Sequence, residues 1–286
     1  MSNQANAVIS KIISNQGNLT FIENEIAHFV MNKPDFFTKN TITAIAQEIG
    51  VSETSINRFC KKVGFKGFND FKIAIAQDTH YRNMNSKAQQ RENISFADSL
   101  AFDYNDLIMN TSALIEEEDI LKTVKMIVKA KNIYIFGVLS SWMAAMELKQ
   151  KLSLVGINAF AYNDSYNMKL SASLSTPDDL VIAITRSGSV REIIDALGLA
   201  HQNNAQIITI TSYNSTSVTQ YANIKLIASD KLSVKNNAIL SEHITFLFVI
   251  DLIFGTLLNS DSRYMKKKLN SDAVIESSQF WKSEYM

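Results

Sequence analysis

The chain of 286 residues is poor in the residues that form disulfides and metal sites, since it contains one cysteine, Cys60, and four histidines. A single cysteine excludes an internal disulfide and a cysteine-rich zinc site, and so few histidines argue against any structural metal ion. No stretch approaches the roughly 18 apolar residues of a membrane span, and the longest apolar run, residues 246–258, is interrupted by Asp251. The first residues also lack the charged start and apolar run of a secretion signal. We therefore expect a cytoplasmic protein with no membrane partner, no metal and no cofactor.

Net charge is absent as well, because 28 basic residues balance 28 acidic ones. The overall balance conceals a local excess: between Gly50 and Lys87, seven Lys or Arg side chains accompany three Asp or Glu side chains. The length of the chain favours two domains of ordinary size, each able to bury its own core. This modest basic patch therefore belongs to the N-terminal half of a two-part protein.

Two hydrophobic patterns divide the chain. In the first eighty residues apolar side chains recur three and four positions apart, as in Ile22, Ile26 and Phe29, which indicates helices. Further on, strand-length runs that are apolar on both faces alternate with helical stretches, at residues 132–136, 157–162, 180–185, 206–211 and 224–228. Such an alternation is typical of parallel strands buried under helices on both sides. The sequence thus predicts an all-α domain followed by a doubly wound α/β domain with a mainly parallel, five-stranded sheet.

The segment from residue 42 to residue 65 has the pattern of a helix-turn-helix. Ala46 is small where two helices would cross, Gly50 suits a left-handed turn, and Ser52 is placed to cap the second helix. On that helix Ile56, Phe59, Cys60 and Val63 should point inward. The polar positions that should face DNA, through base edges or phosphates, are Ser52, Thr54, Ser55, Asn57, Arg58, Lys61, Lys62 and, beyond the helix, Lys66. The alternative is a helical hairpin with an ordinary solvated face.

The run IGVSETSINRFCKKVGFKGFNDFKIAIAQ resembles the end of the N-terminal domain of the RpiR family of transcriptional regulators. The family pattern VS...RFC.KLGF.GF...K finds matches at Val51, Ser52, Arg58, Phe59, Cys60, Lys62, Gly64, Phe65, Gly67, Phe68 and Lys72. The resemblance implies that the N-terminal half binds double-stranded operator DNA. It also makes Cys60 a buried packing residue, since nothing cationic lies on its inward face to activate a thiolate.

Two serine-rich turns follow predicted strands in the C-terminal half. GVLSSWM carries Ser140 and Ser141, and TRSGSVRE carries Thr185, Ser187, Gly188 and Ser189. Hydroxyls beside the free amides of a helix N-terminus form an anion site, which open α/β sheets place beyond the carboxyl ends of their strands. Neither turn matches the nucleotide-binding motifs for ATP or NAD, so a small phosphomonoester fits better. The alternative is that these serines only cap helices.

The pair of turns resembles the SIS domain, a sugar isomerase fold that RpiR regulators carry after their DNA-binding domain. The resemblance implies that Ser140, Ser141 and the second turn hold a phosphorylated sugar or amino sugar. Two departures stand in the first turn, where Leu139 replaces the usual glycine and Trp142 replaces a small residue. A crowded turn of this kind could narrow the pocket. Asp164, at another strand end, is expected either to accept hydrogen bonds from sugar hydroxyls or to cap the next helix.

The predicted organisation is a helix-turn-helix domain (1–77), a linker with a lead-in helix (78–110), a SIS domain (111–260) and a C-terminal tail (261–286). The predicted function is a transcriptional regulator that controls carbohydrate or amino-sugar genes and works as a homodimer or tetramer, with no catalytic residues. The rival function is a phosphosugar aldose-ketose isomerase, which needs a base beside the substrate. Glu242 and His243 are candidates, but adjacent helical residues point about 100° apart and could not readily both face one substrate. A sugar-binding module without a DNA role is the weakest alternative, because it leaves the basic patch unexplained.

Overall fold

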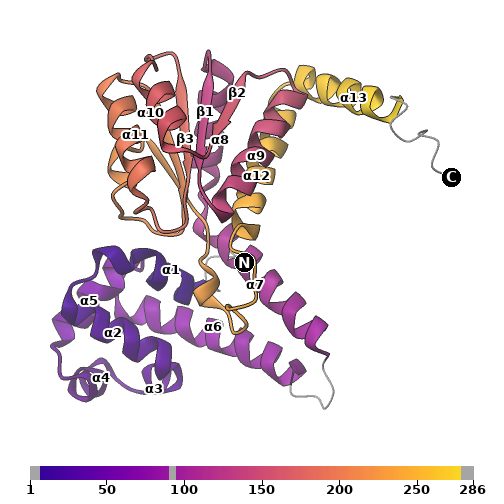
Figure 1. Cartoon of the computed structure of the whole chain (residues 1–286). Helices are drawn as coiled ribbons and strands as arrows, with labels where there is room; N and C mark the ends of the chain where they lie inside the picture. The colour runs from indigo at the N-terminus through magenta and orange to yellow at the C-terminus, as the bar shows by residue number, and fades with distance from the viewer. Residues whose placement is uncertain (1–6, 90–94, 278–286) are drawn as a thin grey trace. The chain divides into compact units, whose positions relative to one another are not determined.

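The structure is a computed structural model that describes residues 7–89 and 95–277 (Figure 1). It divides into two compact units, which we describe separately. The helical unit comprises Met1–Ile115, Ser212–Thr216 and Ile227–Thr245. The sheet unit comprises Glu116–Thr211, Ser217–Leu226 and Phe246–Met286. The helical unit is therefore built from three separate stretches of sequence, two of which interrupt the sheet unit.

The helical unit begins with short helices that share one apolar core. Its elements are α1 (Val8–Asn15), η2 (Gln16–Asn18), α2 (Phe21–Asn32), α3 (Pro34–Lys39), α4 (Ile42–Ile49), α5 (Glu53–Lys62), α6 (Phe68–Gln89), α7 (Phe96–Leu114) and η4 (Lys231–Ser233). The rings of Phe37 and Phe59 each meet Phe71 edge to face, at 5.5 and 5.6 Å between centroids. This aromatic cluster joins α3, α5 and α6, so the second helix of the predicted motif is anchored from beneath.

Helix ends in this unit follow the local sequence. The Thr20 side chain caps α2, and the Glu23 carboxylate accepts the Thr20 amide in return, a capping box that satisfies two amide groups. Helix α4 stops at Gly50, which adopts φ +80° in the left-handed region. Because only glycine takes that conformation at little cost, the chain turns there and α5 starts three residues later. The predicted turn glycine is confirmed.

The sheet unit has five strands in the order β2-β1-β3-β4-β5. Its elements are α8 (Glu117–Lys129), β1 (Ile133–Gly137), α9 (Ser140–Leu154), β2 (Ala159–Tyr162), α10 (Ser165–Ser173), β3 (Leu180–Ile184), α11 (Arg191–Gln202), β4 (Gln206–Thr211), η3 (Thr219–Tyr221), β5 (Ile224–Ile227), α12 (Ile244–Ser260) and α13 (Ser262–Ser277). The pairings β1–β2, β1–β3 and β3–β4 are parallel. The predicted doubly wound fold is confirmed.

Helices cover both faces of this sheet. The crossover from β1 to β2 runs opposite to the crossovers from β2 to β3 and from β3 to β4, so right-handed connections put α9 on one face and α10 and α11 on the other. Buried side chains of α10 and α11, among them Met168 and Ile193, pack with Val181 and Ile207 of the strands. Strand β3 is buried at every position, as its unbroken apolar sequence predicts.

Two helices extend into segments that the sequence assigned to linker and tail. Helix α6 continues to Gln89 through the segment where a linker is predicted, and residues 90–94 lie outside the described residues. Helix α13 occupies 262–277 of the predicted C-terminal tail. The sequence of α6 after residue 77 and that of α13 lack a regular apolar stripe, which is why periodicity did not indicate a helix in either segment. The domain boundaries themselves remain predictions.

Within the described ranges, no individual helix has the length and apolarity that a membrane crossing requires. The bent pair 244–260 and 262–275, with 113° between its helices, meets that criterion only when the two are taken together.

Candidate functional site

The first candidate site is the outward face of α5. Ser52 caps this helix by accepting the Ser55 amide at 3.1 Å, as predicted. Its inward side chains, Ile56, Phe59 and Cys60, are fully buried, and Val63 beyond the helix is buried too. Of the predicted DNA-binding residues, Ser55 is half-buried, whereas the exposed ones are Ser52, Thr54, Asn57, Arg58, Lys61, Lys62 and Lys66. The structure thus groups polar, exposed side chains on one face of a capped helix.

A buried carboxylate lies under this face and was not found from the sequence. Glu23 of α2 is 2% exposed and forms ion pairs with Lys62, at 2.7 Å, and with Arg58, at 3.5 Å. Burial acts to raise the pKa of Glu23, but hydrogen bonds from Lys62 and Thr20 outweigh it and hold that pKa below its ordinary value. The carboxylate therefore stays charged and orients two cations of α5. The Thr-x-x-Glu spacing of the capping box is a signal that could have drawn attention to Glu23.

Two other polar residues of the predicted set are partly engaged within the protein. The side-chain carbonyl of Asn57 accepts the Phe68 amide at 3.0 Å, which leaves its NH2 group as the part able to reach a base edge. The backbone amide of Lys66 donates to Asp70 at 2.9 Å, while its ammonium group lies on the exposed side chain. Asn57 therefore ties α5 to the turn before α6 in addition to any role toward DNA.

Lys72, which fits the family pattern, is also engaged: its ammonium group donates to the Asn40 carbonyl at 2.6 Å. Its place in the pattern is thus explained by packing of α6 on α3. Cys60 is buried, and burial raises the pKa of its thiol to about 12, so it is a protonated core residue, as predicted.

The second candidate site comprises the two serine turns. The first lies between β1 and α9. A Cβ on Gly137 would lie 2.9 Å from the Ser141 carbonyl oxygen, so only glycine allows α9 to approach the strand this closely. Leu139 follows with φ +52° and ψ −128°, backbone angles that glycine adopts readily and leucine rarely does. The residue that replaces the family's glycine is therefore strained, and its side chain is 89% exposed.

The second turn lies between β3 and α11. Thr185 is buried, and Gly188 has φ +62°. Ser187 accepts hydrogen bonds from the Ser189 amide at 3.3 Å and the Ser189 hydroxyl at 2.9 Å. These bonds stay within the turn and hold the two hydroxyls together.

Neither turn supplies a side-chain cap to the helix that follows it. The N-cap residues of α9 and α11 are Leu139 and Val190, and neither provides a side-chain cap hydrogen bond. Gly137 pairs with Ile184 across β1 and β3, so the two turns leave neighbouring strands at the same edge of the sheet. Two uncapped helix N-termini with hydroxyl-bearing turns thus lie side by side, an arrangement that suits an anion. The alternative that these serines only cap helices finds no support.

Asp164, unlike the serines of the two turns, caps a helix. It accepts the Asn167 amide at 2.9 Å and caps α10, and this bond together with that from the Asn167 side chain lowers the pKa of Asp164. The capping alternative for Asp164 is confirmed.

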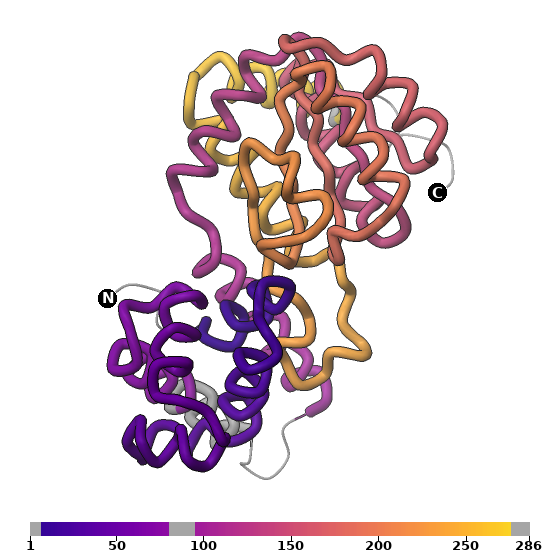
Figure 2. The backbone as a smooth tube through the Cα atoms, turned by 90° about the vertical axis from the view of Figure 1, so that its left-hand side faces the viewer, coloured from indigo at the N-terminus to yellow at the C-terminus, as the bar shows by residue number. Residues whose placement is uncertain are grey.

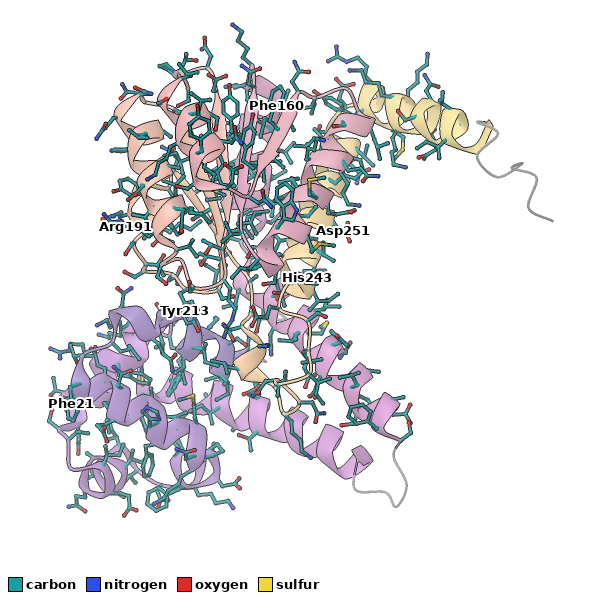
Figure 3. All side chains as sticks on the ribbon, in the orientation of Figure 1. Phe21, Phe160, Arg191, Tyr213, His243 and Asp251 are labelled. Atoms are coloured by element: carbon teal, nitrogen blue, oxygen red, sulfur yellow. The ribbon has the colours of Figure 1, made fainter. Side chains whose placement is uncertain are left out.

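A hollow of about 500 Å³ between α10 and α11 also carries basic groups. Lys169 and Arg191 both pair with Asp195 there, each at 2.9 Å, and Arg191 points outward from α11 (Figure 3). Asp195 engages both cations and offsets part of their charge, which makes this hollow a poorer anion site than the serine turns.

Glu242 and His243, the candidate bases of an isomerase, have the following surroundings. Glu242 forms an ion pair with Lys231 at 3.1 Å, and His243 directly precedes α12 (Figure 3). Both residues belong to the helical unit, whereas the serine turns belong to the sheet unit.

Comparison with known proteins identifies both domains. A sequence model of the helix-turn-helix domain of the RpiR family matches residues 6–81, and a model of the SIS domain matches residues 126–255. A transcriptional regulator of helix-turn-helix type from Haemophilus influenzae is 28% identical over 261 residues, which cover 89% of this chain and 91% of the relative. A regulator of the same type from Clostridium perfringens is 26% identical, over 88% of this chain and 93% of its own length.

Solved structures show the same fold. The NanR protein of Vibrio vulnificus, in complex with ManNAc-6P, superposes with a TM-score of 0.59 at 24% identity, over 94% of this chain and 98% of NanR. The sugar isomerase domain of an RpiR transcription factor from Sphaerobacter thermophilus gives a TM-score of 0.55 at 16% identity, over 63% of this chain and 97% of that domain. The chain is therefore a transcriptional regulator of the RpiR family, with a helix-turn-helix domain followed by a SIS domain.

Proposed function

We propose that this regulator reads operator DNA with α5 and that a phosphorylated sugar or amino sugar, held at the two serine turns, changes its affinity for that DNA. The genes it controls would then serve carbohydrate or amino-sugar metabolism. The observation that carries the proposal is the pair of helix N-termini without side-chain caps at neighbouring strand ends, each preceded or begun by serine hydroxyls. A dianionic phosphate is a ligand that such amides and hydroxyls stabilise.

The DNA-reading part of the proposal rests on the face of α5. Thr54, Ser55 and the NH2 group of Asn57 are suited to base edges, and the cations Arg58, Lys61, Lys62 and Lys66 are suited to guanine or phosphate. Glu23 fixes Arg58 and Lys62 before DNA arrives, which lowers the entropic cost of ordering them in the complex. Paired half-sites on an operator call for a homodimer or a tetramer, and we infer that the protein works as one, in the cytoplasm.

Catalysis is not part of this proposal. An isomerase requires a base next to the substrate, and the candidate Glu242 is engaged with Lys231. A regulator needs only a pocket that distinguishes its effector. The relatives named above are described as transcriptional regulators, which favours this choice.

Thermal unfolding of the full chain with a panel of sugar phosphates, their unphosphorylated counterparts and inorganic phosphate tests the effector class. ManNAc-6P, the ligand in the NanR complex, belongs in the panel. A binding sugar phosphate at 100 times its Kd should stabilise the protein by about 2.7 kcal/mol, whereas the matched free sugar should not. Equal shifts with the free sugars would contradict the phosphate assignment.

Operator binding is the second measurement. The stabilising sugar phosphate should change the affinity of the protein for an operator selected from random duplexes. The sugar phosphate recovered from the same mixture should not have been converted to its aldose or ketose isomer. Sedimentation at micromolar concentration should show dimers or tetramers. A monomer both with and without DNA would overturn the inferred assembly.

A further inference from the structure

Two loops inside the SIS-matching region belong structurally to the helical unit. They are 212–216, which follows β4, and 227–245, which follows β5, and the SIS match spans residues 126–255. Figures 1 and 2 show the second loop, in orange, beside the indigo helix α1. These loops therefore contribute to the unit that carries α5.

Helix α1 is hydrogen-bonded to both loops through buried groups. The Ser10 hydroxyl lies 3.0 Å from the Ser229 hydroxyl, which in turn lies 3.1 Å from that of Ser233. All three side chains are almost fully buried. The Asn214 amide donates to the Ser14 carbonyl at 2.8 Å, so the first loop is bound to the end of α1 as well. Buried hydrogen bonds of this kind are costly to break, because a buried donor or acceptor would be left without a partner and without water.

The two loops are also joined to each other and to α7. The Tyr213 hydroxyl donates to Asp230 at 3.2 Å, and Asp230, 3% exposed, accepts the Leu232 amide at 2.9 Å. The Ser229 amide donates to the Thr111 hydroxyl of α7 at 3.1 Å. The loops and α1 therefore form one hydrogen-bonded assembly, in which Tyr213, labelled in Figure 3, joins the two loops.

The inner face of α1 is part of the core that supports α5. Val8 and Ile12 are fully buried in the same cluster as Ile56 and Phe59 of α5. A close-packed core transmits a displacement of one helix to its neighbours, since it has no free volume in which to absorb it. A shift of α1 would therefore displace the core side chains that support the outward face of α5.

The first loop is bracketed by residues bonded to the second serine turn. The Thr211 hydroxyl donates to the Arg186 carbonyl at 3.1 Å, and the Val218 amide donates to the Gly188 carbonyl at 3.2 Å. The Thr185 amide donates to the Ile210 carbonyl at 3.0 Å. Residues 211 and 218 flank the loop along the chain, so a rearrangement of the turn on ligand binding displaces both ends of the 212–216 loop.

We propose that α1 and the loops 212–216 and 227–245 form the link through which the state of the second serine turn reaches the helix-turn-helix. This inference rests on the proposed function and adds the route of its regulation. Ser10 and Tyr213 are positioning residues in this route, since Ser10 joins α1 to Ser229 and Tyr213 joins the first loop to Asp230 of the second. A ligand that favours one conformation of the turn would change operator affinity by its differential affinity for the two states.

The test is operator titration of the full chain by fluorescence anisotropy, with and without the sugar phosphate that most stabilises the wild type. The ratio of the two operator Kd values is the coupling factor. Ser10→Ala combined with Tyr213→Phe should lower that factor by about tenfold, while ligand Kd and ligand-free operator Kd stay within about twofold of wild type. Ser14→Ala is the matched control, because its buried hydroxyl donates only to Lys11 within α1. It should leave the coupling factor unchanged.

A second arm needs no ligand. Gly188→Ala strains the turn, because alanine resists φ +62°, and should shift operator affinity in the wild-type background. The same substitution should have no effect in the Ser10→Ala, Tyr213→Phe background. Single Tyr213→Phe serves if the double variant unfolds. The inference is overturned if the folded variants keep the full coupling factor or the full effect of Gly188→Ala. A wild type that binds no sugar phosphate would instead overturn the proposed function, and the Gly188→Ala arm would still decide the route.

Discussion

The two candidate sites differ in how far their polar groups are already satisfied. On α5 the cations Arg58 and Lys62 share a buried carboxylate, and the Asn57 carbonyl is hydrogen-bonded to the next turn. At the serine turns the helices α9 and α11 start without side-chain caps, the Ser187 hydroxyl accepts from both the amide and the hydroxyl of Ser189, and Leu139 has a strained backbone.

The difference indicates two ways of preparing for a charged ligand. A DNA-reading face benefits from cations fixed in place, because a long polyanion then meets an ordered surface. A small-anion site instead benefits from hydroxyls and helix N-termini without side-chain caps, because a bound anion can accept hydrogen bonds there.

Loss of the serine hydroxyls should have the largest effect. Ser141→Ala with Ser187→Ala should lower sugar-phosphate affinity at least tenfold, since charge-assisted hydrogen bonds contribute about 1.5 to 3 kcal/mol each. Isothermal titration measures the loss, and ligand-free operator binding should be unchanged. Ser173→Ala, whose hydroxyl donates to a carbonyl in its own helix, is the matched control. A double variant that binds and responds at the wild-type concentration would show that the turns are not the ligand site.

Arg58→Ala should weaken operator binding by about 1 to 3 kcal/mol. Loss of discrimination between specific and scrambled duplexes would indicate base reading, and uniform weakening would indicate a phosphate contact. Lys61→Ala is the informative comparison, because no acidic partner holds Lys61 among the described residues. If the ion pair with Glu23 orders the Arg58 side chain for DNA binding, Arg58→Ala should lose more binding free energy than Lys61→Ala. Unchanged affinity for both duplexes in folded Arg58→Ala would remove this residue from the interface.

Glu23→Gln should destabilise the helical unit by about 1 to 2 kcal/mol, because it weakens the capping box and leaves two cations unpaired. The folded-state pKa of Glu23 is lowered, so its contribution is complete above the unfolded-state pKa and is lost as the pH falls through the folded-state value. Urea unfolding from pH 7 down to pH 3 should therefore show a shallower pH dependence in the variant. Glu25→Gln, on the exposed side of the same helix, should reproduce the wild-type curve.

Leu139→Gly should have the smallest effect, a stabilisation of the sheet unit by about 1 kcal/mol through relief of the positive φ. Leu174→Gly is the control, since this exposed leucine has an ordinary φ of −100° and glycine there should destabilise. A destabilised Leu139→Gly protein would mean that the leucine side chain, not its backbone, matters at this turn.

Much of this architecture was accessible from the sequence because its signals are local. Five apolar runs gave the strands to within two residues, and Gly50 with Ser52 gave the turn and the start of α5. Glu23 was missed because its partners lie on another helix, 35 and 39 positions away, and no periodicity reports such a contact. The replacement of a glycine by Leu139 was visible in the sequence, but the strain appears only in the dihedral angles. The long end of α6 was missed because its polar sequence lacks an apolar stripe.

The discontinuous make-up of the helical unit has a consequence for how the protein is made and dissected. During synthesis an N-terminal domain ordinarily completes its folding while the rest of the chain is still emerging. Here Ser10 must wait for Ser229, and Asp103 must wait for Asn236, whose amide it accepts at 3.0 Å. A fragment cut after residue 115 would lack both partners and leave buried hydroxyls and a carboxylate without them. The helical unit of this chain is therefore completed only after all five strands of the sheet unit have been translated.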